Sequence, residues 1–269
     1  RYNGGGAGGS NSAALMFGGL TTPPTTARAE TEEWNGTSWT EVADLNTARY
    51  ALGGLGQNTE AALAFGGGPG AKTVTESWNG SSWTEVNDLN TGKEQRSGAG
   101  EYTNALAFGG NPVVAITELW NGTSWAEDSD LNTGRKKPGA SGTTTAALAF
   151  SGQSDDEVPA GTALTEEWTG AGADIGAWAT GGTMNRARYA IAGAGTKTAA
   201  LAFGGNYPPG DNFATQTELW DGASWTEVND LNTGREGVRG GGTYTSAIAF
   251  GGNNPNNTAV SESWNGTNW

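Results

Sequence analysis

The residues of this chain whose types suit chemistry recur at regular intervals. A Glu stands two positions before a Trp in a motif that occurs six times, at Glu32, Glu76, Glu118, Glu166, Glu218 and Glu262. A basic residue lies 15 or 16 positions before the Phe of a second repeated motif, at Arg1, Arg49, Lys93, Arg135, Arg188 and Arg235. Paired carboxylates are the groups that hydrolyse glycosidic bonds, whereas a charged pair beside a large aromatic ring suits the binding of a polar ligand.

The amino-acid composition excludes most other kinds of catalytic and metal site. The 269 residues contain no Cys and no His, which excludes thiol catalysis, disulfides, Cys/His zinc sites and His-based triads. No nucleophile stands beside a recognisable base. The acidic run Asp155-Asp156-Glu157 lacks the alternating spacing of a calcium-binding loop, so we expect it to be solvated. The sequence thus predicts no catalytic residue, no metal ligand and no cofactor.

The charge of the chain limits its partners. The formal net charge is -14, which argues against binding to nucleic acid or to an anionic lipid surface. No apolar run is long enough to span a bilayer, so we expect no membrane insertion. Because the chain begins at Arg1 without a Met or a signal peptide, we expect it to be cut from a longer repeat-bearing protein.

Four landmarks define a repeat, and each predicts a strand or its start. The basic residue precedes a Gly-rich strand. A run of the type Ala-Leu-Ala-Phe-Gly-Gly follows, with its Phe at Phe17, Phe65, Phe108, Phe150, Phe203 and Phe250. Glu-x-Trp predicts a third strand, and a second Trp predicts a fourth. Asn-Gly between the last two, as at Asn35-Gly36, predicts a tight two-residue hairpin turn. Nothing shows a helical period.

The repeat resembles the kelch repeat. A basic residue, a Gly-rich strand, an apolar strand ending in Gly-Gly, then an aromatic residue and a Trp at a period of 42 to 53 residues cover the whole chain. Kelch repeats usually carry Tyr where this chain has Trp34. The resemblance implies one six-bladed β-propeller of four-stranded antiparallel blades over residues 1–269. The expected blades span approximately 1–43, 49–86, 93–127, 135–180, 188–228 and 235–269. Blade six would close the ring by packing against blade one.

A residue found in every blade is best interpreted as structural. We expect each Glu of Glu-x-Trp to pair with the basic residue or with backbone amides. Eleven of the 14 basic residues lie around the first strand, which would line the channel. A second hypothesis is therefore an electropositive channel mouth that binds an anion, formed by Arg49, Arg135, Lys136, Arg188 and Arg235. Six Arg–Glu pairs within about 4 Å would exclude it.

Residues that break the repeat are the better candidates for specificity. The loops between the second and third strands vary most, and in a propeller they open on one face. We expect a binding site there, formed by Tyr207, Asp211, Phe213, Asp155 and Asp156. The alternative is that the two loop aromatics fold back onto their own blade.

The near-identity of the repeats, rich in Trp-Asn-Gly and free of Cys, also resembles kelch-like repeat proteins of marine bacteriophages. That resemblance implies a non-enzymatic virion or appendage protein that binds a host-surface glycan or a protein partner, outside the cell or within a larger assembly. One alternative is a secreted lectin with one sugar site per blade, since Arg, Glu and Trp are also the residue types of six-bladed fucose-binding lectins. Another is a carboxylate-dependent glycan hydrolase.

Overall fold

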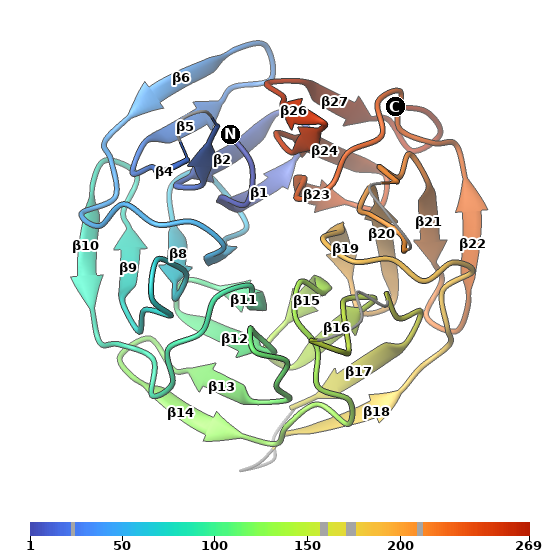
Figure 1. The fold of residues 1–269 in the computed structure, drawn as a ribbon, viewed down its shortest axis with the longest axis horizontal. Helices are drawn as coiled ribbons and strands as arrows, with labels where there is room; N and C mark the ends of the chain where they lie inside the picture. Colours follow the sequence, from blue (N-terminus) through green and yellow to red (C-terminus); the bar gives the residue numbers. More distant parts are fainter. Residues whose placement is uncertain (23–24, 157–160, 171–175, 209–211) are drawn as a thin grey trace.

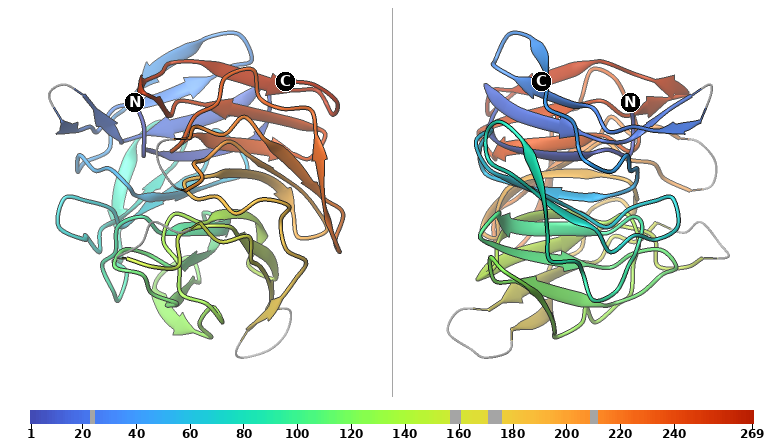
Figure 2. Two further views of the ribbon diagram at one scale, coloured as in Figure 1. Left: turned by 45° about the vertical axis from the view of Figure 1, so that its right-hand side comes forward. Right: turned by 90° about the vertical axis from the view of Figure 1, so that its left-hand side faces the viewer.

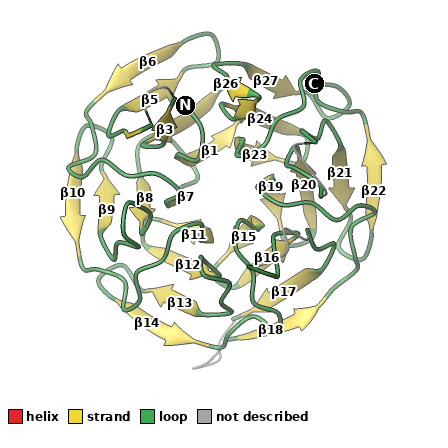
Figure 3. Ribbon diagram, in the orientation of Figure 1, coloured by secondary structure: helices red, strands yellow, loops and turns green. Residues whose placement is uncertain are grey.

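The computed structural model describes residues 1–22, 25–156, 161–170, 176–208 and 212–269. It shows a six-bladed β-propeller, a ring of antiparallel sheets around a central channel (Figure 1). Figure 3 shows only strands and loops, and among the described residues no helix is long and apolar enough to cross a membrane. The prediction of an all-β propeller is confirmed.

Each blade is one continuous segment. Its strands follow one another in chain order from the channel to the rim. Blade one contains β1 (Gly5–Ser10), β2 (Ala13–Phe17), β5 (Thr31–Trp34) and β6 (Trp39–Val42). Blade two contains β7 (Gly53–Leu55), β8 (Ala62–Phe65), β9 (Thr75–Trp78) and β10 (Trp83–Val86). Blade three contains β11 (Ser97–Glu101), β12 (Asn104–Phe108), β13 (Thr117–Trp120) and β14 (Trp125–Asp128).

The remaining blades repeat this order. Blade four contains β15 (Gly139–Thr143), β16 (Ala146–Phe150), β17 (Thr165–Thr169) and β18 (Ala177–Thr180). Blade five contains β19 (Ala192–Thr196), β20 (Ala199–Phe203), β21 (Thr217–Trp220) and β22 (Trp225–Val228). Blade six contains β23 (Arg239–Thr243), β24 (Ser246–Phe250) and β27 (Ser261–Trp264). The last residue, Trp269, holds the position at which the outer strand starts in the other blades.

The second strand of each blade is the core of the molecule. Its Ala-Leu-Ala-Phe side chains are almost wholly buried, because both faces of the blade are covered by neighbouring blades. In blades one, two and four the Phe ring lies over a Gly of the inner strand. A Cβ on Gly53 would stand 2.1 Å from the ring of Phe65, and the inner strands are Gly-rich for this reason as well as for their crowding at the channel.

The second Trp of each repeat ties its blade to the preceding one. Trp83 of blade two lies 4.8 Å from the ring of Phe17 in blade one, and its indole N–H donates to the Thr31 hydroxyl at 2.9 Å. The same ring contact recurs in the pairs Phe65–Trp125, Phe108–Trp178, Phe150–Trp225, Phe203–Trp269 and Phe250–Trp39. Because the last pair joins blade six to blade one, aromatic packing runs around the complete ring.

The first and last blades meet at this closing junction (Figures 1 and 2). β1 packs beside β23. The Trp39 indole donates to the Ser261 hydroxyl at 2.9 Å, which reproduces the bond of Trp83 to Thr31. No strand is exchanged between the termini, since every sheet takes its strands from one segment. Closure rests on packing of blade six against blade one, as the repeat pattern predicted.

The turn between the two outer strands differs from the prediction. Trp34 pairs with Trp39, so four residues form the loop instead of two. The Asn35 side-chain oxygen accepts hydrogen bonds from the backbone N–H groups of Thr37 and Ser38, both at 3.0 Å. Only Gly36 has a positive φ, of 92°. Asn is favoured here because its side chain caps the loop, not because its backbone enters the left-handed region.

Variable loops gather on one side of the ring. The Gly-Gly pair after the second strand has positive φ at both positions, 61° at Gly18 and 106° at Gly19. The chain then enters the loop that leads to the third strand. In blade one this loop carries a short hairpin of β3 (Leu20–Thr21) and β4 (Thr26–Ala27), and in blade six one of β25 (Asn253–Asn254) and β26 (Asn256–Asn257). We call this side the loop face.

Candidate functional site

An Arg and the repeated Glu form an ion pair inside every blade, and the pair is buried in five of the six. The Arg49 guanidinium Nη2 lies 2.9 Å from the Glu76 Oε1, and neither side chain is exposed. The equivalent pairs are Arg1–Glu32, Arg96–Glu118, Arg135–Glu166, Arg188–Glu218 and Arg235–Glu262. Burial lowers the pKa of Arg49, and the Glu76 carboxylate opposes that shift. All six pairs fall within 4 Å, so the arginines are bound to carboxylates rather than available to a ligand.

The connector that leads into each blade completes the pair. Asn46 donates to one Glu76 oxygen from its backbone N–H at 2.7 Å and from its amide at 2.8 Å. Arg49 also donates to the carbonyls of Gly66 and Val74. The carboxylate therefore accepts several hydrogen bonds although its side chain is fully buried, which is the condition for a stable buried charge. The interpretation of the repeated Glu as structural fits these contacts.

These contacts correct the predicted channel mouth. Arg49, Arg135, Arg188 and Arg235 are fully buried beneath the loop face instead of surrounding an opening. Each turns outward between blades, because the third-strand Glu with which it pairs lies away from the channel. Lys136 is also paired, because its ammonium lies 2.7 Å from the Asp156 carboxylate. The expectation of a cationic mouth at these five residues was wrong.

A further correction concerns blade three. The spacing rule assigned the paired cation to Lys93, but Arg96 holds the bond to Glu118, at 2.7 Å. Arg96 stands three residues later in the chain and reaches the same carboxylate from the start of β11. Residue spacing alone could not separate the two, because both side chains are long and flexible.

The loop-face end of the channel holds a ring of six equivalent residues. They are Asn3, Ala51, Gln95, Lys137, Ala190 and Gly237, each one or two positions before an inner strand and each with a φ between 50° and 60°. The backbone N–H of Ala51 donates to the Asn3 carbonyl at 2.6 Å, and the same bond links the next four residues in turn, each to the one before it. We call this set the mouth ring. Its backbone is nearly constant, whereas its side chains differ at almost every position.

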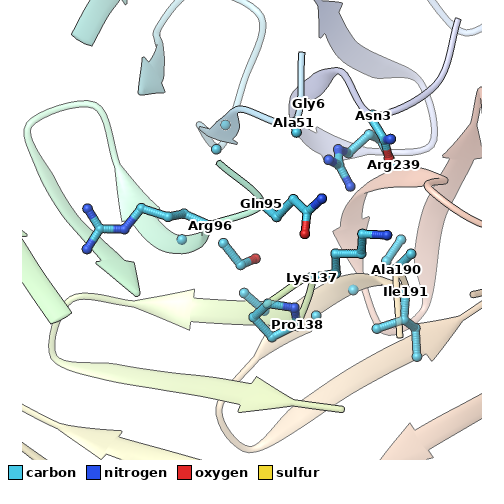
Figure 4. Close-up of a pocket in the computed structure, with 18 of the residues that line it drawn as sticks. Asn3, Gly6, Ala51, Gln95, Arg96, Lys137, Pro138, Ala190, Ile191 and Arg239 are labelled. Carbon is cyan, nitrogen blue, oxygen red and sulfur yellow. The ribbon is translucent and has the colours of Figure 1, made fainter. Parts of the chain in front are cut away.

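A cavity of about 90 Å³ lies at the mouth ring (Figure 4). Gln95, Lys137 and Arg239 extend toward it, whereas Arg96 points away to its partner Glu118 (Figure 4). The opposite end of the channel is a larger cavity of about 290 Å³ lined by Gly, Ala, Ser, Thr, Leu55 and Gln57, without a charged side chain. The two ends of the channel thus differ in charge.

Two cations at the mouth ring have no carboxylate partner. Among the described residues, no Asp or Glu oxygen lies within 4 Å of Lys137 or Arg239. The Lys137 ammonium stands 5.3 Å from the centre of the Tyr189 ring. Arg239 donates from its Nε to the Gly4 carbonyl. Burial lowers the pKa of Lys137, and the Glu236 carboxylate opposes that shift. Burial also lowers the pKa of Arg239, to about 10.

Sequence reasoning counted Lys137 and Arg239 among the basic residues near the inner strands but did not select them. Both residues depart from the repeat pattern. Lys137 is a second basic residue two positions after the repeated one, and Arg239 stands at an inner-strand position where most other blades have Gly or another small residue. Departures from a repeat consensus inside the channel, as well as in the loops, would have identified them.

The predicted loop residues lie apart from this cavity. Tyr207 is half-buried, its hydroxyl donates to Gln216 at 3.2 Å, and the Arg186 guanidinium stacks 3.7 Å above its ring. Phe213 pairs through its backbone with Asn206 and is half-buried. These contacts fit the alternative that the loop aromatics fold back onto their own blade. Asp211 lies outside the described residues.

The acidic loop of blade four connects two blades. Asp156 accepts a hydrogen bond from the Val113 backbone N–H at 2.9 Å in addition to its pair with Lys136. These bonds, the one from Lys136 first, hold the pKa of Asp156 below its ordinary value. Asp155 is exposed beside it, and Glu157 is not described. Within the described part of the chain, no group of three His, Cys, Asp or Glu side chains is placed to hold a metal ion.

No protein-family model matches this sequence, and no curated protein matches it either.

Proposed function

We propose that this propeller is a non-enzymatic recognition and structural module whose loop face binds a glycan or a protein partner. The observation that carries the proposal is the mouth ring. Six equivalent backbone positions carry five different residue types there, beside the loops that vary most between blades. A rigid scaffold with variable side chains and loops at one end is the usual design of a binding surface.

The chemistry of the mouth ring indicates the ligand. Lys137 and Arg239 face the cavity without a carboxylate partner, beside the Gln95 amide. A carboxylate or sulfate group of an acidic glycan, or an acidic side chain of a protein, would supply the missing charge. Because the cavity is small, only the charged end group of such a ligand enters it, and the rest of the ligand lies across the surrounding loops.

The repeated positions offer less to a ligand. In five of the six blades the Arg and Glu side chains are at most 7% exposed, so a sugar cannot reach them without opening the junction between blades. This argues against a lectin site at the Arg, Glu and Trp of each blade. It also favours the non-enzymatic alternative, because the repeated carboxylates are already engaged by Arg and Asn.

The resemblance of the repeat to kelch repeats and to kelch-like proteins of marine bacteriophages suggests a setting. We propose a protein of a virion or an appendage, exposed outside the cell, in which the loop face meets a host-surface glycan or a neighbouring subunit. The aromatic closure around the ring makes a rigid disc suited to that role.

A glycan array tests this proposal. The chain is compared with Lys137→Gln/Arg239→Gln, with Tyr207→Ala/Phe213→Ala, and with Lys197→Gln, a partly exposed lysine of the opposite face. We expect acidic glycans to bind the chain, the first variant to lose at least about tenfold in affinity, and Lys197→Gln to bind normally. Loss only in the second variant would move the site to the blade-five loop. Binding unchanged in both would refute a loop-face site.

A further inference from the structure

The backbone N–H groups of the mouth ring are already used by the ring itself. In five of the six ring residues the N–H donates to the carbonyl of the ring residue before it, at 2.6 to 3.1 Å. A ligand group that enters the cavity therefore meets side chains. Those that extend toward it belong to Gln95, Lys137 and Arg239 (Figure 4).

One of these side chains has an acceptor without a donor. The Gln95 Oε1 is buried, and among the described residues no group donates a hydrogen bond to it. The backbone of Gln95 is fully paired, because its N–H donates to the Ala51 carbonyl at 2.7 Å and its carbonyl accepts from Lys137 at 3.0 Å. Buried polar groups without a partner are rare and costly in proteins. A ligand that brings a donor to the Gln95 oxygen would remove this cost.

The fold does not require an amide at this position. The equivalent residues of blades two, five and six are Ala51, Ala190 and Gly237, which have the same backbone conformation, with φ between 50° and 60°. Each of them also makes the same backbone hydrogen bond within the mouth ring. Because Ala and Gly suffice there, the Gln95 side chain is better explained by ligand recognition than by stability.

The two cations beside Gln95 need a partner of the opposite kind. Neither Lys137 nor Arg239 has a carboxylate within 4 Å among the described residues, as shown above. Glu236, the carboxylate that opposes the lowering of the Lys137 pKa by burial, accepts a hydrogen bond from the Asn206 amide at 3.1 Å. A ligand that satisfies all three side chains therefore carries an anion and a hydrogen-bond donor, close enough together to enter a cavity of about 90 Å³.

This requirement separates the two classes of ligand considered for the loop face. The ionised side chain of Asp or Glu only accepts hydrogen bonds, and it has no donor beside its carboxylate. A sugar ring that bears a carboxylate, as uronic acids do, has hydroxyl groups on the neighbouring carbon atoms. A hydroxyl is a donor as well as an acceptor. The acidic sugar thus supplies both groups, whereas the acidic side chain supplies one.

We propose that Gln95 is a specificity residue through which the mouth ring selects an acidic sugar, a ring with a carboxylate beside a hydroxyl, over an acidic side chain of a protein. The carboxylate binds Lys137 and Arg239, and the neighbouring hydroxyl donates to the Gln95 oxygen. The inference rests on the proposed function, because it concerns the ligand of the same cavity. It goes further by choosing between the glycan and the protein partner.

Four small probes separate the two requirements. Methyl glucuronoside has the carboxylate and the hydroxyls, tetrahydropyran-2-carboxylate has the same ring and carboxylate without hydroxyls, and methyl glucoside has the hydroxyls without the carboxylate. Glutamate blocked with acetyl and methylamide groups represents a protein side chain. NMR titration of the unmodified chain, followed at the backbone amides of the mouth ring, gives the affinities. We expect the glucuronoside to bind at least about tenfold more tightly than each of the other three.

Gln95→Met tests the donor site, because Met has an unbranched side chain of similar length and only a weak acceptor. Its matched control is Gln57→Met, since Gln57 lines the opposite end of the channel. We expect Gln95→Met to bind the glucuronoside no more tightly than it binds tetrahydropyran-2-carboxylate, and its affinity for the latter to be unchanged. Gln57→Met is expected to bind both as the unmodified chain does, and Lys137→Gln/Arg239→Gln to lose both.

The outcomes distinguish this inference from the proposed function. Equal affinity of the unmodified chain for the glucuronoside and for tetrahydropyran-2-carboxylate overturns the role of Gln95 but leaves the anion site in place. Tightest binding of the blocked glutamate assigns the mouth ring to a protein partner and also overturns the inference. If none of the probes binds, the anion site of the proposed function fails together with it.

Discussion

The cost of breaking one repeated ion pair follows from its burial. In Arg49→Met the Glu76 carboxylate stays buried without its cation, and the carbonyls of Gly66 and Val74 lose their donor. Removing one partner of a buried pair costs about 3–5 kcal/mol, because the remaining charge is neither paired nor hydrated. For a chain of this size that corresponds to a fall in melting temperature of roughly 10 °C.

Blade one supplies a matched control within the same molecule. Arg1 makes the equivalent bond to Glu32, but that carboxylate is 38% exposed and water replaces part of what Arg1 gives. We therefore expect Arg1→Met to cost about 1 kcal/mol or less. The two variants change the same residue type at equivalent positions of two repeats, so the difference between them reports the effect of burial.

A third variant separates charge from packing. In Arg49→Met/Glu76→Leu no unpaired charge is left inside the blade, and we expect it to lose less stability than Arg49→Met alone, even though Asn46 loses its acceptor. Urea unfolding followed by tryptophan fluorescence, with calorimetric melting beside it, measures all three. If Arg49→Met and Arg1→Met lower the free energy of unfolding equally, burial does not set the cost and the reasoning is refuted.

Two further predictions use other parts of the structure. We expect an NMR titration to place the pKa of Asp156 below 3.8, its ordinary value, and Lys136→Met to raise it toward that value. Because the folded pKa is the lower one, the contribution of Asp156 to stability is complete above pH 3.8 and is lost as the pH falls through the folded pKa; an unshifted titration would contradict the bond to Lys136. We also expect Gly222→Ala to lower the free energy of unfolding by about 1–2 kcal/mol. Its φ is 96°, and a Cβ there would meet nothing closer than 3.4 Å, so the cost is that of the backbone conformation alone. Urea unfolding that shows no loss would mean that the turn relaxes.

The strands and the blade order were predictable because each repeat carries its own signals. Alternating apolar and small residues mark the second strand, and Glu-x-Trp marks the third, so local sequence specified both. Six copies removed the ambiguity that a single short strand would leave. The hairpin turn was predicted less well, because Asn-Gly fits both a two-residue turn and a four-residue loop whose side chain caps it.

The spacing of the basic residues did not predict which of them would pair with a carboxylate and which would face the channel. Arg188 and Lys137 are both basic and both precede an inner strand, yet one is buried in an ion pair and the other faces the channel. The sequence places each of them on a connector that leads into a blade but does not say which way its side chain turns. Arg96 took the role expected of Lys93 for a similar reason, since two flexible cations competed for one carboxylate.

The sequence by itself determined the repeat, its six copies and the strands. Those properties are local or nearly so, and each copy of the repeat specifies them again. Only the tertiary structure decided which residues converge on the channel, because that depends on closing the ring. The mouth ring unites one residue from each blade. Such sites arise from distances between blades, which no single repeat contains.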